Sequence, residues 1–270
     1  MATISHEDLH KYFEKTKSYK ATIHFLLKQE ELALTNKKES PGAALKRLAL
    51  AEDMIFLTTN YIIMNGMSQF MLKQRSEEAL NDGRKSLFKA VAYMEEVVSP
   101  NIDAPFSSYE EMLNGIRDVD ANRRHIIVKK LCLALQLLQT AYGDRTKWRW
   151  AFVELEGRIA TVTKNIMNLK TAVINTDPAS PDYEPTMYHL ILIKKLLLQA
   201  ADRYREKYEL STNLIDDFKM AINFLNALKR IHILLGERES AETLKKKADI
   251  WSAKLELDMK KQEETTVKKT

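Results

Sequence analysis

The chain has 270 residues, of which 45% are hydrophobic and 29% charged, and its formal net charge is +5. Its 7 glycines and 6 prolines are too few for the many tight turns of a sheet protein, so the composition predicts an all-α fold. A single cysteine, Cys132, excludes an internal disulfide and a cysteine-rich metal site. The mild positive charge permits an acidic partner but does not require one.

The sequence also predicts a location. Residues 1–8 contain no basic stretch followed by an apolar run, so we expect no secretory signal. No segment approaches the roughly 18 consecutive apolar residues that a membrane-spanning helix needs. The two most apolar segments, 126–138 and 190–198, are each interrupted by a Lys-Lys pair. A cytoplasmic protein without a membrane span is therefore expected.

Capping residues divide the first part of the chain into long helices. Ser5, followed by two acidic residues, predicts a helix that continues to about Thr35. The Ser-Pro pair at 40–41 is typical of a capped start with proline in the first turn, and it predicts a helix toward Lys73. The Asn-Asp-Gly sequence at 81–83 predicts a break or bend in the helix that follows.

The middle of the chain has the most regular apolar pattern. One apolar helix is predicted from Asp120 to Tyr142, and a second from Asp144 to about Ile174. In the second helix, apolar residues alternate at spacings of four and three, as in a helix packed lengthwise against near-parallel neighbours. These residues are Trp148, Phe152, Leu155, Ile159, Val162, Ile166, Leu169 and Val173.

The distribution of prolines and charges predicts the domain organisation. We expect a helical domain over residues 1–175 and a proline-rich linker or loop over 176–185. Helical hairpins over 186–258 would pack on the first part, and a flexible charged tail would follow at 259–270. The complete prediction is about eight to nine long helices stacked as antiparallel hairpins.

One C-terminal segment resembles a known family. A large residue, a glycine before a turn and two small residues have the spacing of a tetratricopeptide-repeat hairpin; they are Leu228, Gly236, Ala241 and Ala248. The resemblance covers only Leu225 to Trp251. The helix lengths are similar to those of the stacked helices in tetratricopeptide and 14-3-3-type folds. The resemblance implies a concave groove that binds a peptide or a helix.

A short motif near the start raises the possibility of a metal site. His6-Glu-Asp-Leu-His10 matches the HExxH pattern of zinc peptidases, in which two histidines one helical turn apart bind zinc and a glutamate, here Glu7, acts as general base. Glu30 falls where some of these enzymes place a third ligand. Such enzymes bury this helix beneath a sheet, and no strand is predicted here. Two histidines on an exposed helix are the simpler interpretation, so a zinc metalloenzyme that uses His6, His10 and Glu30 is kept as an alternative.

Positive charge is concentrated in the middle of the chain. Between Gly115 and Lys170, eleven basic residues stand against five acidic ones. Arginine beside an exposed aromatic residue is a common recognition surface. The predicted partner-binding residues are therefore Arg123, Arg124, Arg145, Arg149 and Trp150. The competing interpretation is a solvated basic face, with Trp150 buried by another helix.

No catalytic cluster is predicted. Cys132 lies among apolar residues and is interpreted as a small hydrophobic side chain, and His232 as a core histidine. We predict a non-enzymatic adaptor or scaffold without a cofactor, which binds a protein or peptide partner through a groove or a basic helical face and is compatible with an oligomer. A nucleic-acid-binding protein is a further alternative, disfavoured because the basic residues are not interleaved with several stacking aromatic residues.

Overall fold

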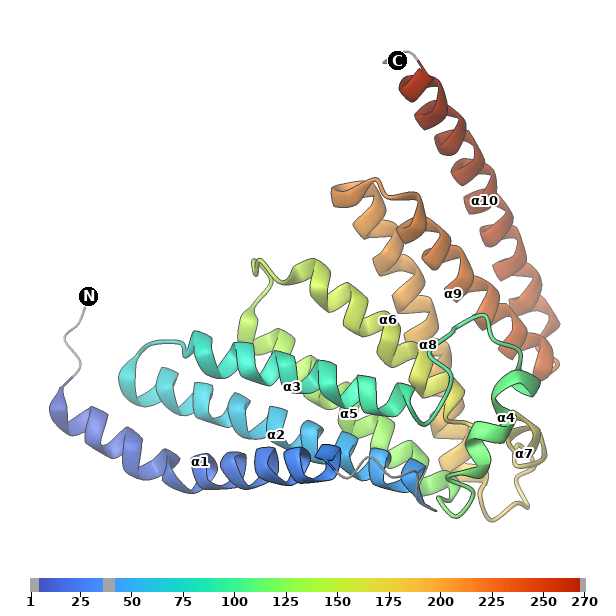
Figure 1. Ribbon diagram of the computed structural model, residues 1–270. Coiled ribbons are helices and arrows are strands. Elements are labelled where there is room, and N and C mark those ends of the chain that lie inside the picture. The colour runs from blue at the N-terminus through green and yellow to red at the C-terminus, as the bar shows by residue number, and fades with distance from the viewer. Residues whose placement is uncertain (1–4, 36–41, 268–270) are drawn as a thin grey trace. The chain divides into compact units, whose positions relative to one another are not determined.

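The structure is a computed structural model and describes residues 5–35 and 42–267. Over these residues the chain forms ten α-helices and one short π-helix, and no strand (Figure 1). This confirms the predicted all-α fold. None of the described helices combines the length and the apolar character that a bilayer crossing requires.

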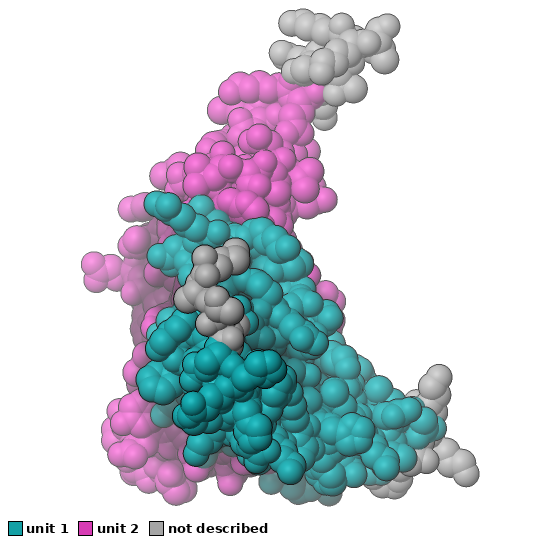
Figure 2. All heavy atoms as spheres, turned by 90° about the vertical axis from the view of Figure 1, so that its left-hand side faces the viewer, with its two compact units in different colours: residues 1–98, 112–118, 126–149 teal, residues 99–111, 119–125, 150–270 magenta. Residues whose placement is uncertain are grey.

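The chain divides into two compact units, which differ from the predicted domains (Figure 2). Unit 1 contains residues 1–98, 112–118 and 126–149, and unit 2 contains residues 99–111, 119–125 and 150–270. The proline-rich segment that was predicted as a linker lies inside unit 2. It forms consecutive turns as far as Asp182, and a helix begins at the next residue.

Unit 1 is built from α1 (His6–Thr35), α2 (Ala43–Leu72), α3 (Glu77–Glu95) and most of α5 (Ala121–Tyr142). Each of the first three runs antiparallel to the next, so α1 and α3 point in the same direction (Figure 1). Ser5 caps α1 as predicted, because its Oγ accepts a hydrogen bond from the Asp8 backbone N–H at 3.0 Å. Ser76 caps α3 in the same way. The predicted cap at 40–41 lies outside the described residues.

The predicted break at 81–83 is wrong, because α3 is continuous through it. Gly83 is buried against α2, where a Cβ atom would lie 3.3 Å from Cβ of Tyr61. The Thr58 hydroxyl of α2 donates a hydrogen bond to the Gly83 carbonyl at 3.2 Å. This glycine therefore permits two helix backbones to approach closely, instead of turning the chain.

Unit 2 is organised around α6 (Arg149–Asn165), of which residues 159–165 are buried on every side. The predicted helix from 144 to 174 is divided into α6 and α7 (Leu169–Ile174). The division arises because the Asn168 side chain caps α7, accepting hydrogen bonds from the backbone N–H groups of Lys170 and Thr171. The other elements that lie wholly or partly in unit 2 are α4 (Phe106–Asn114), α8 (Tyr183–Lys207), η1 (Tyr208–Thr212), α9 (Ile215–Leu234) and α10 (Arg238–Val267).

Helices α9 and α10 form an antiparallel hairpin at the place of the tetratricopeptide-like spacing (Figure 1). Gly236 turns the chain with a φ of +74°, a conformation that favours glycine. Leu228, Ala241 and Ala248 are all buried. Helix α10 continues to Val267, through most of the segment that was predicted as a charged tail.

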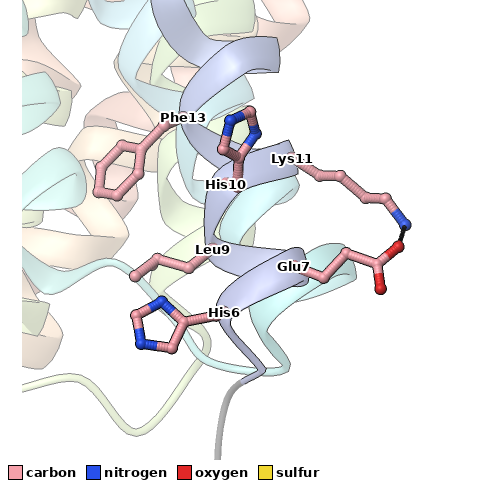
Figure 3. Close-up of a pocket in the computed structure, with 6 residues that line it drawn as sticks. All are labelled: His6, Glu7, Leu9, His10, Lys11 and Phe13. Atoms are coloured by element: carbon pink, nitrogen blue, oxygen red, sulfur yellow. Dashed lines mark hydrogen bonds and ion pairs between the residues drawn. The ribbon is translucent and has the colours of Figure 1, made fainter.

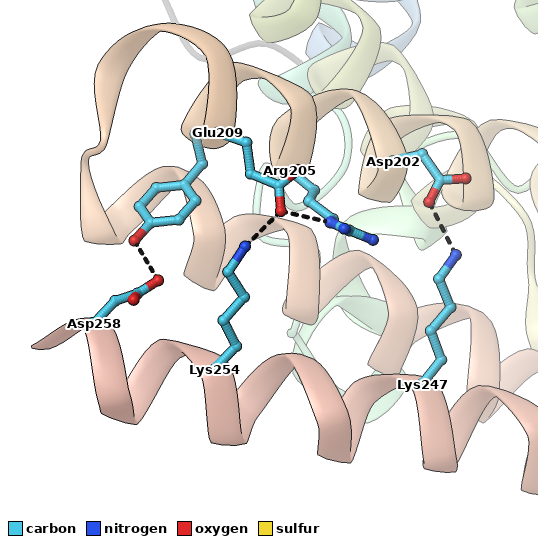
Figure 4. A network of polar contacts seen from close by, with 7 residues as sticks. Asp202, Arg205, Glu209, Lys247, Lys254 and Asp258 are labelled. Carbon is cyan, nitrogen blue, oxygen red and sulfur yellow. Dashed lines mark hydrogen bonds and ion pairs between the residues drawn. The ribbon is translucent and has the colours of Figure 1, made fainter.

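Polar contacts between α8–η1 and α10 recur at intervals of seven residues (Figure 4). Lys247 pairs with Asp202 at 2.9 Å, and Lys254 pairs with Glu209 at 2.5 Å. A seven-residue repeat on both helices indicates that they pack nearly parallel over two turns. Trp251, between the two lysines in sequence, is buried. Because the four charged side chains are partly exposed, these pairs fix the register of the helices more than they add stability.

Candidate functional site

The two histidines of the HExxH motif lie in an open pocket that a single helix lines (Figure 3). The lining residues are His6, Glu7, Leu9, His10, Lys11 and Phe13, all from the first turns of α1. Glu7 forms an ion pair with Lys11 at 2.5 Å. Among the described residues, no three His, Cys, Asp or Glu side chains lie close enough together to hold a metal ion.

Glu30 is separated from the two histidines by the length of α1. The helix is continuous, so the twenty residues between His10 and Glu30 correspond to roughly 30 Å. The buried Glu30 carboxylate accepts hydrogen bonds from Tyr93 Oη at 2.5 Å and from Lys89 Nζ at 2.7 Å. Burial, followed by the bond to Glu30, raises the pKa of Tyr93. Glu30 therefore joins α1 to α3, and it does not reach a metal held by His6 and His10.

The predicted partner-binding residues fall into separate places. Arg123 and Arg124 lie at the start of α5, and Arg145 follows its end, roughly 30 Å further along the helix. Arg149 begins α6 and is followed by Trp150, which packs partly buried against the core of unit 2. Arg123, Arg124 and Trp150 belong to unit 2, whereas Arg145 and Arg149 belong to unit 1.

Arg124 is engaged inside unit 2. Only 8% of it is exposed, and burial lowers the pKa of its guanidinium. Its Nη1 donates to the Ile166 carbonyl at 2.9 Å, and its Nε donates to the Val119 carbonyl at 2.8 Å. The carbonyl groups at the end of a helix lack partners within it, and Arg124 satisfies one at the end of α6. It is therefore a structural residue, whereas Arg123 is exposed.

Sequence reasoning missed a buried polar cluster at the same end of α6. Lys164 Nζ donates to Asn165 Oδ1 at 2.7 Å, and Asn165 Nδ2 donates to the Ser99 carbonyl at 2.6 Å. Burial, assisted by the nearby Arg230, lowers the pKa of Lys164 to about 8. His189 Nε2 lies 2.9 Å from the Thr163 carbonyl oxygen.

Perturbed pKa values can mark functional sites, but these groups are almost completely buried. Lys164 is 3% exposed, His189 2% and Asn165 not at all. Each contacts a backbone carbonyl or a neighbouring amide. The arrangement attaches the end of α6 to the segment at 99–102 and to α8, so we assign it to the stability of unit 2.

The outer face of α2 is apolar and exposed. Phe56, Ile63 and Phe70 follow one another at intervals of seven residues, and their exposed fractions are 53%, 37% and 78%. Seven residues are close to two helical turns, so the three side chains form a line along the helix. Thr59 and Gly66 occupy the intermediate positions, which completes the alternation of three and four that is typical of a helix-pairing seam.

This face also lacks charge. The nineteen residues at 54–72 include no Asp, Glu, Lys or Arg. The opposite face of α2 lies in the core of unit 1, where Met54 and Leu57 are completely buried. A surface helix normally carries charged residues on its outer side, so α2 is unusual over five turns. The uncharged run is visible in the sequence, and it is the signal that sequence reasoning did not use.

Exposed apolar side chains also lie on α5, which an ion pair joins to α2. Glu52 of α2 and Lys130 of α5 form an ion pair at 3.5 Å. One turn further along each helix, Phe56 and Leu133 are both 53% exposed, and Leu137 is 40% exposed. We call the line of Phe56, Ile63 and Phe70, together with Thr59 and Gly66, the α2 face.

Comparison with known proteins identifies a family. The sequence model of the TP0443 family matches residues 8–259. Comparisons with curated proteins and with solved structures give no match. The function is therefore argued from the residues of this chain.

Proposed function

The chain belongs to the TP0443 family, whose match spans both units, and from this premise we propose one function for the molecule: a non-enzymatic helical scaffold that binds protein through the α2 face. The observation that carries the proposal is the exposed line of Phe56, Ile63 and Phe70 on a helix without charge over 54–72. Exposed apolar patches of this kind mark interaction sites.

The energetics of burial support a protein partner. Phenylalanine buries on the order of 200 Å² when it is covered completely. At about 25 cal/mol per Å², covering the exposed parts of Phe56, Ile63 and Phe70 would contribute several kcal/mol. Aromatic residues in the centre of an interface commonly dominate its binding free energy. Transfer of these apolar side chains from water to contact with a second apolar surface is therefore favourable.

The geometry favours a helical occupant. Anchors at intervals of three, four and seven residues are the pattern by which an amphipathic helix docks. Gly66 has nothing within 4 Å of the position where a Cβ would stand, so a helix backbone can approach closely there. The helical groove that the tetratricopeptide-like resemblance implies belongs to the same class of function. The basic residues predicted earlier are not part of this surface.

Site-specific photocrosslinking in the native cell tests this function. A benzophenone amino acid is placed at Phe56, Ile63 or Phe70, and crosslinked peptides are identified by mass spectrometry. The matched control is Phe25, an aromatic residue of α1 that is 59% exposed and lies outside the α2 face. We expect protein crosslinks from the three positions of the α2 face and none above background from Phe25. Absence of crosslinks from all three would refute the proposal.

A further inference from the structure

We infer that the occupant of the α2 face is the same helix of a second copy of this chain, packed antiparallel about a two-fold axis between Ile63 and Gly66. The inference rests on the proposed function, because it names the partner of that surface. It follows from the distribution of charge and of side-chain size along α2.

The two ends of the α2 face carry opposite charges. Glu52 and Asp53 precede Phe56, and Lys73 follows Phe70. In an antiparallel pair about this axis, Lys73 of each copy lies opposite Phe56 of the other, one helical turn from Glu52 and Asp53, so the basic end of each α2 helix meets the acidic end of the other at two symmetric places. A parallel pair would instead place acid against acid and lysine against lysine.

Asp53 and Lys73 remain available for this contact. Burial, followed by repulsion from Glu52, raises the pKa of Asp53, so its carboxylate lacks a compensating cation. Lys73 Nζ donates to the carbonyl of Phe70 at 2.8 Å and lies 5.3 Å from the centre of its ring. Within the described part of the chain, neither residue forms an ion pair with another side chain.

Side-chain sizes are complementary in the same arrangement. With the axis between Ile63 and Gly66, each isoleucine packs on the glycine of the other copy. Phe70 then packs on Thr59, and Phe56 packs beneath the Lys73 ammonium, a favourable cation–π contact. Each layer thus combines a large residue with a smaller or flexible one, as knobs-into-holes packing requires.

The expected dimer is weak, because the contact is narrow. The α2 face between Asp53 and Lys73 spans roughly 30 Å of helix, and one helix pair buries less than a standard interface. We expect a dissociation constant on the order of micromolar.

Sedimentation velocity of the full chain, from about 1 to 200 μM, measures the dimer. The wild type is expected to shift from monomer to dimer, and the Phe56→Ser/Phe70→Ser variant to raise the dissociation constant at least about tenfold. Phe25→Ser, the matched exposed control, is expected to leave it unchanged. Circular dichroism and urea midpoints confirm that each variant is folded.

The outcomes separate this inference from the proposed function. A wild type that stays monomeric over the whole range overturns the second copy as the occupant. If the α2 face then crosslinks to a different protein in the cell, the proposed protein-binding function is supported and only the dimer is refuted. If the α2 face gives no crosslink at all, the proposed function and the dimer are both refuted. If Phe25→Ser weakens the dimer as much as Phe56→Ser/Phe70→Ser does, the contact is not located on the α2 face.

Charge exchange tests the direction of the two helices. Lys73→Glu brings a glutamate within about one helical turn of Glu52 and Asp53 of the other copy, so it is expected to raise the dissociation constant several-fold at low salt. Asp53→Lys/Lys73→Glu restores both attractive contacts and is expected to recover wild-type dimerisation. In a parallel pair the single change merely exchanges one like-charge contact for another. A single variant with unchanged affinity, or a double variant without recovery, overturns the antiparallel arrangement.

Discussion

His189 is a titratable group that is almost completely buried. Its imidazole is 2% exposed, and Nε2 lies 2.9 Å from the Thr163 carbonyl oxygen. A carbonyl only accepts, so this nitrogen carries the proton and the neutral ring donates. Burial, the largest effect, lowers the pKa of His189 from 6.5 to about 4. Protonation therefore opposes folding.

This pKa predicts a loss of stability in mild acid. Between pH 6.5 and about 4 the unfolded chain binds more protons at His189 than the folded chain does, so the free energy of unfolding falls as the pH falls. The shift corresponds to about 3 kcal/mol. His189→Gln keeps a donor and removes the titration, so it should flatten the decline in urea midpoint between pH 7 and pH 4.5. The exposed His10→Gln serves as control, and an equally steep decline in His189→Gln would contradict the prediction.

Sequence reasoning located charged residues but not their surroundings. Arg124 was predicted at a binding surface because it belongs to a basic segment, and the structure directs it to a carbonyl 42 residues away. Lys164 was counted with the same segment, and it is buried. Whether a charged side chain meets water or a helix end depends on tertiary contacts, which residue types alone do not reveal.

At the scale of elements, the end of α6 depends on Asn165. Asn165→Ala removes the hydrogen bond to the Ser99 carbonyl and the acceptor for the buried Lys164 ammonium. We expect a loss of about 3 kcal/mol in the free energy of unfolding. Lys164→Met should be less harmful, since it removes a buried charge along with its hydrogen bonds.

A double-mutant cycle in urea measures the coupling between these two residues. The double variant should lose less than the sum of the single variants, by about 1 kcal/mol or more. Strict additivity would show that Asn165 and Lys164 act independently.

Helix positions followed from local signals where packing agreed with them. Ser5 capped α1 as expected, and Gly236 turned the chain into α10. At 81–83 the close packing of Gly83 on α2 outweighed the local preference for a turn, so the helix continues. Between α6 and α7 the apolar spacing continued without interruption, so it concealed the cap at Asn168. Periodicity describes a face, and it does not show where the backbone changes direction.

A substitution at Gly66 is expected to change the stability of the monomer and the affinity of the dimer in opposite directions. Gly66 lies exposed within α2, two turns before the end of the helix, and a methyl group added there would have no neighbour within 4 Å, so Gly66→Ala should stabilise the folded monomer by about 1 kcal/mol. The added methyl would also stand between the two α2 helices and weaken the dimer. Urea denaturation of dilute protein measures the first effect, and sedimentation velocity the second. Tighter dimerisation by Gly66→Ala would argue against close helix approach.

For the whole molecule, composition sufficed to predict the fold class, and it did not predict the units. Scarce glycine and proline required long helices, which the structure confirms. The proline-rich segment at 176–185 was predicted as a linker or loop, and it lies inside unit 2, which also contains residues 99–111 and 119–125 from earlier in the chain. Such long-range contacts leave no local signature. The α2 face left a partial signal, the uncharged run at 54–72, but a seam that faces the core and one that faces solvent have the same spacing.

Thermal stability should depend on concentration if two copies associate. Mass action favours the folded dimer at high concentration, so the unfolding midpoint is expected to rise by about 3 °C between 2 and 200 μM. The Phe56→Ser/Phe70→Ser variant should show no such rise. Differential scanning calorimetry at several concentrations provides the measurement, and a wild-type midpoint independent of concentration would contradict it.

The line of Phe56, Ile63 and Phe70 has a genetic consequence. In an isologous pair every residue away from the axis occurs twice in the contact, so one codon change alters two places at once. A substitution that weakens each place by about 1.4 kcal/mol would reduce assembly roughly a hundredfold. In a cell that makes both wild-type and altered chains, a mixed pair would lose half as much binding free energy as a pair of two altered chains.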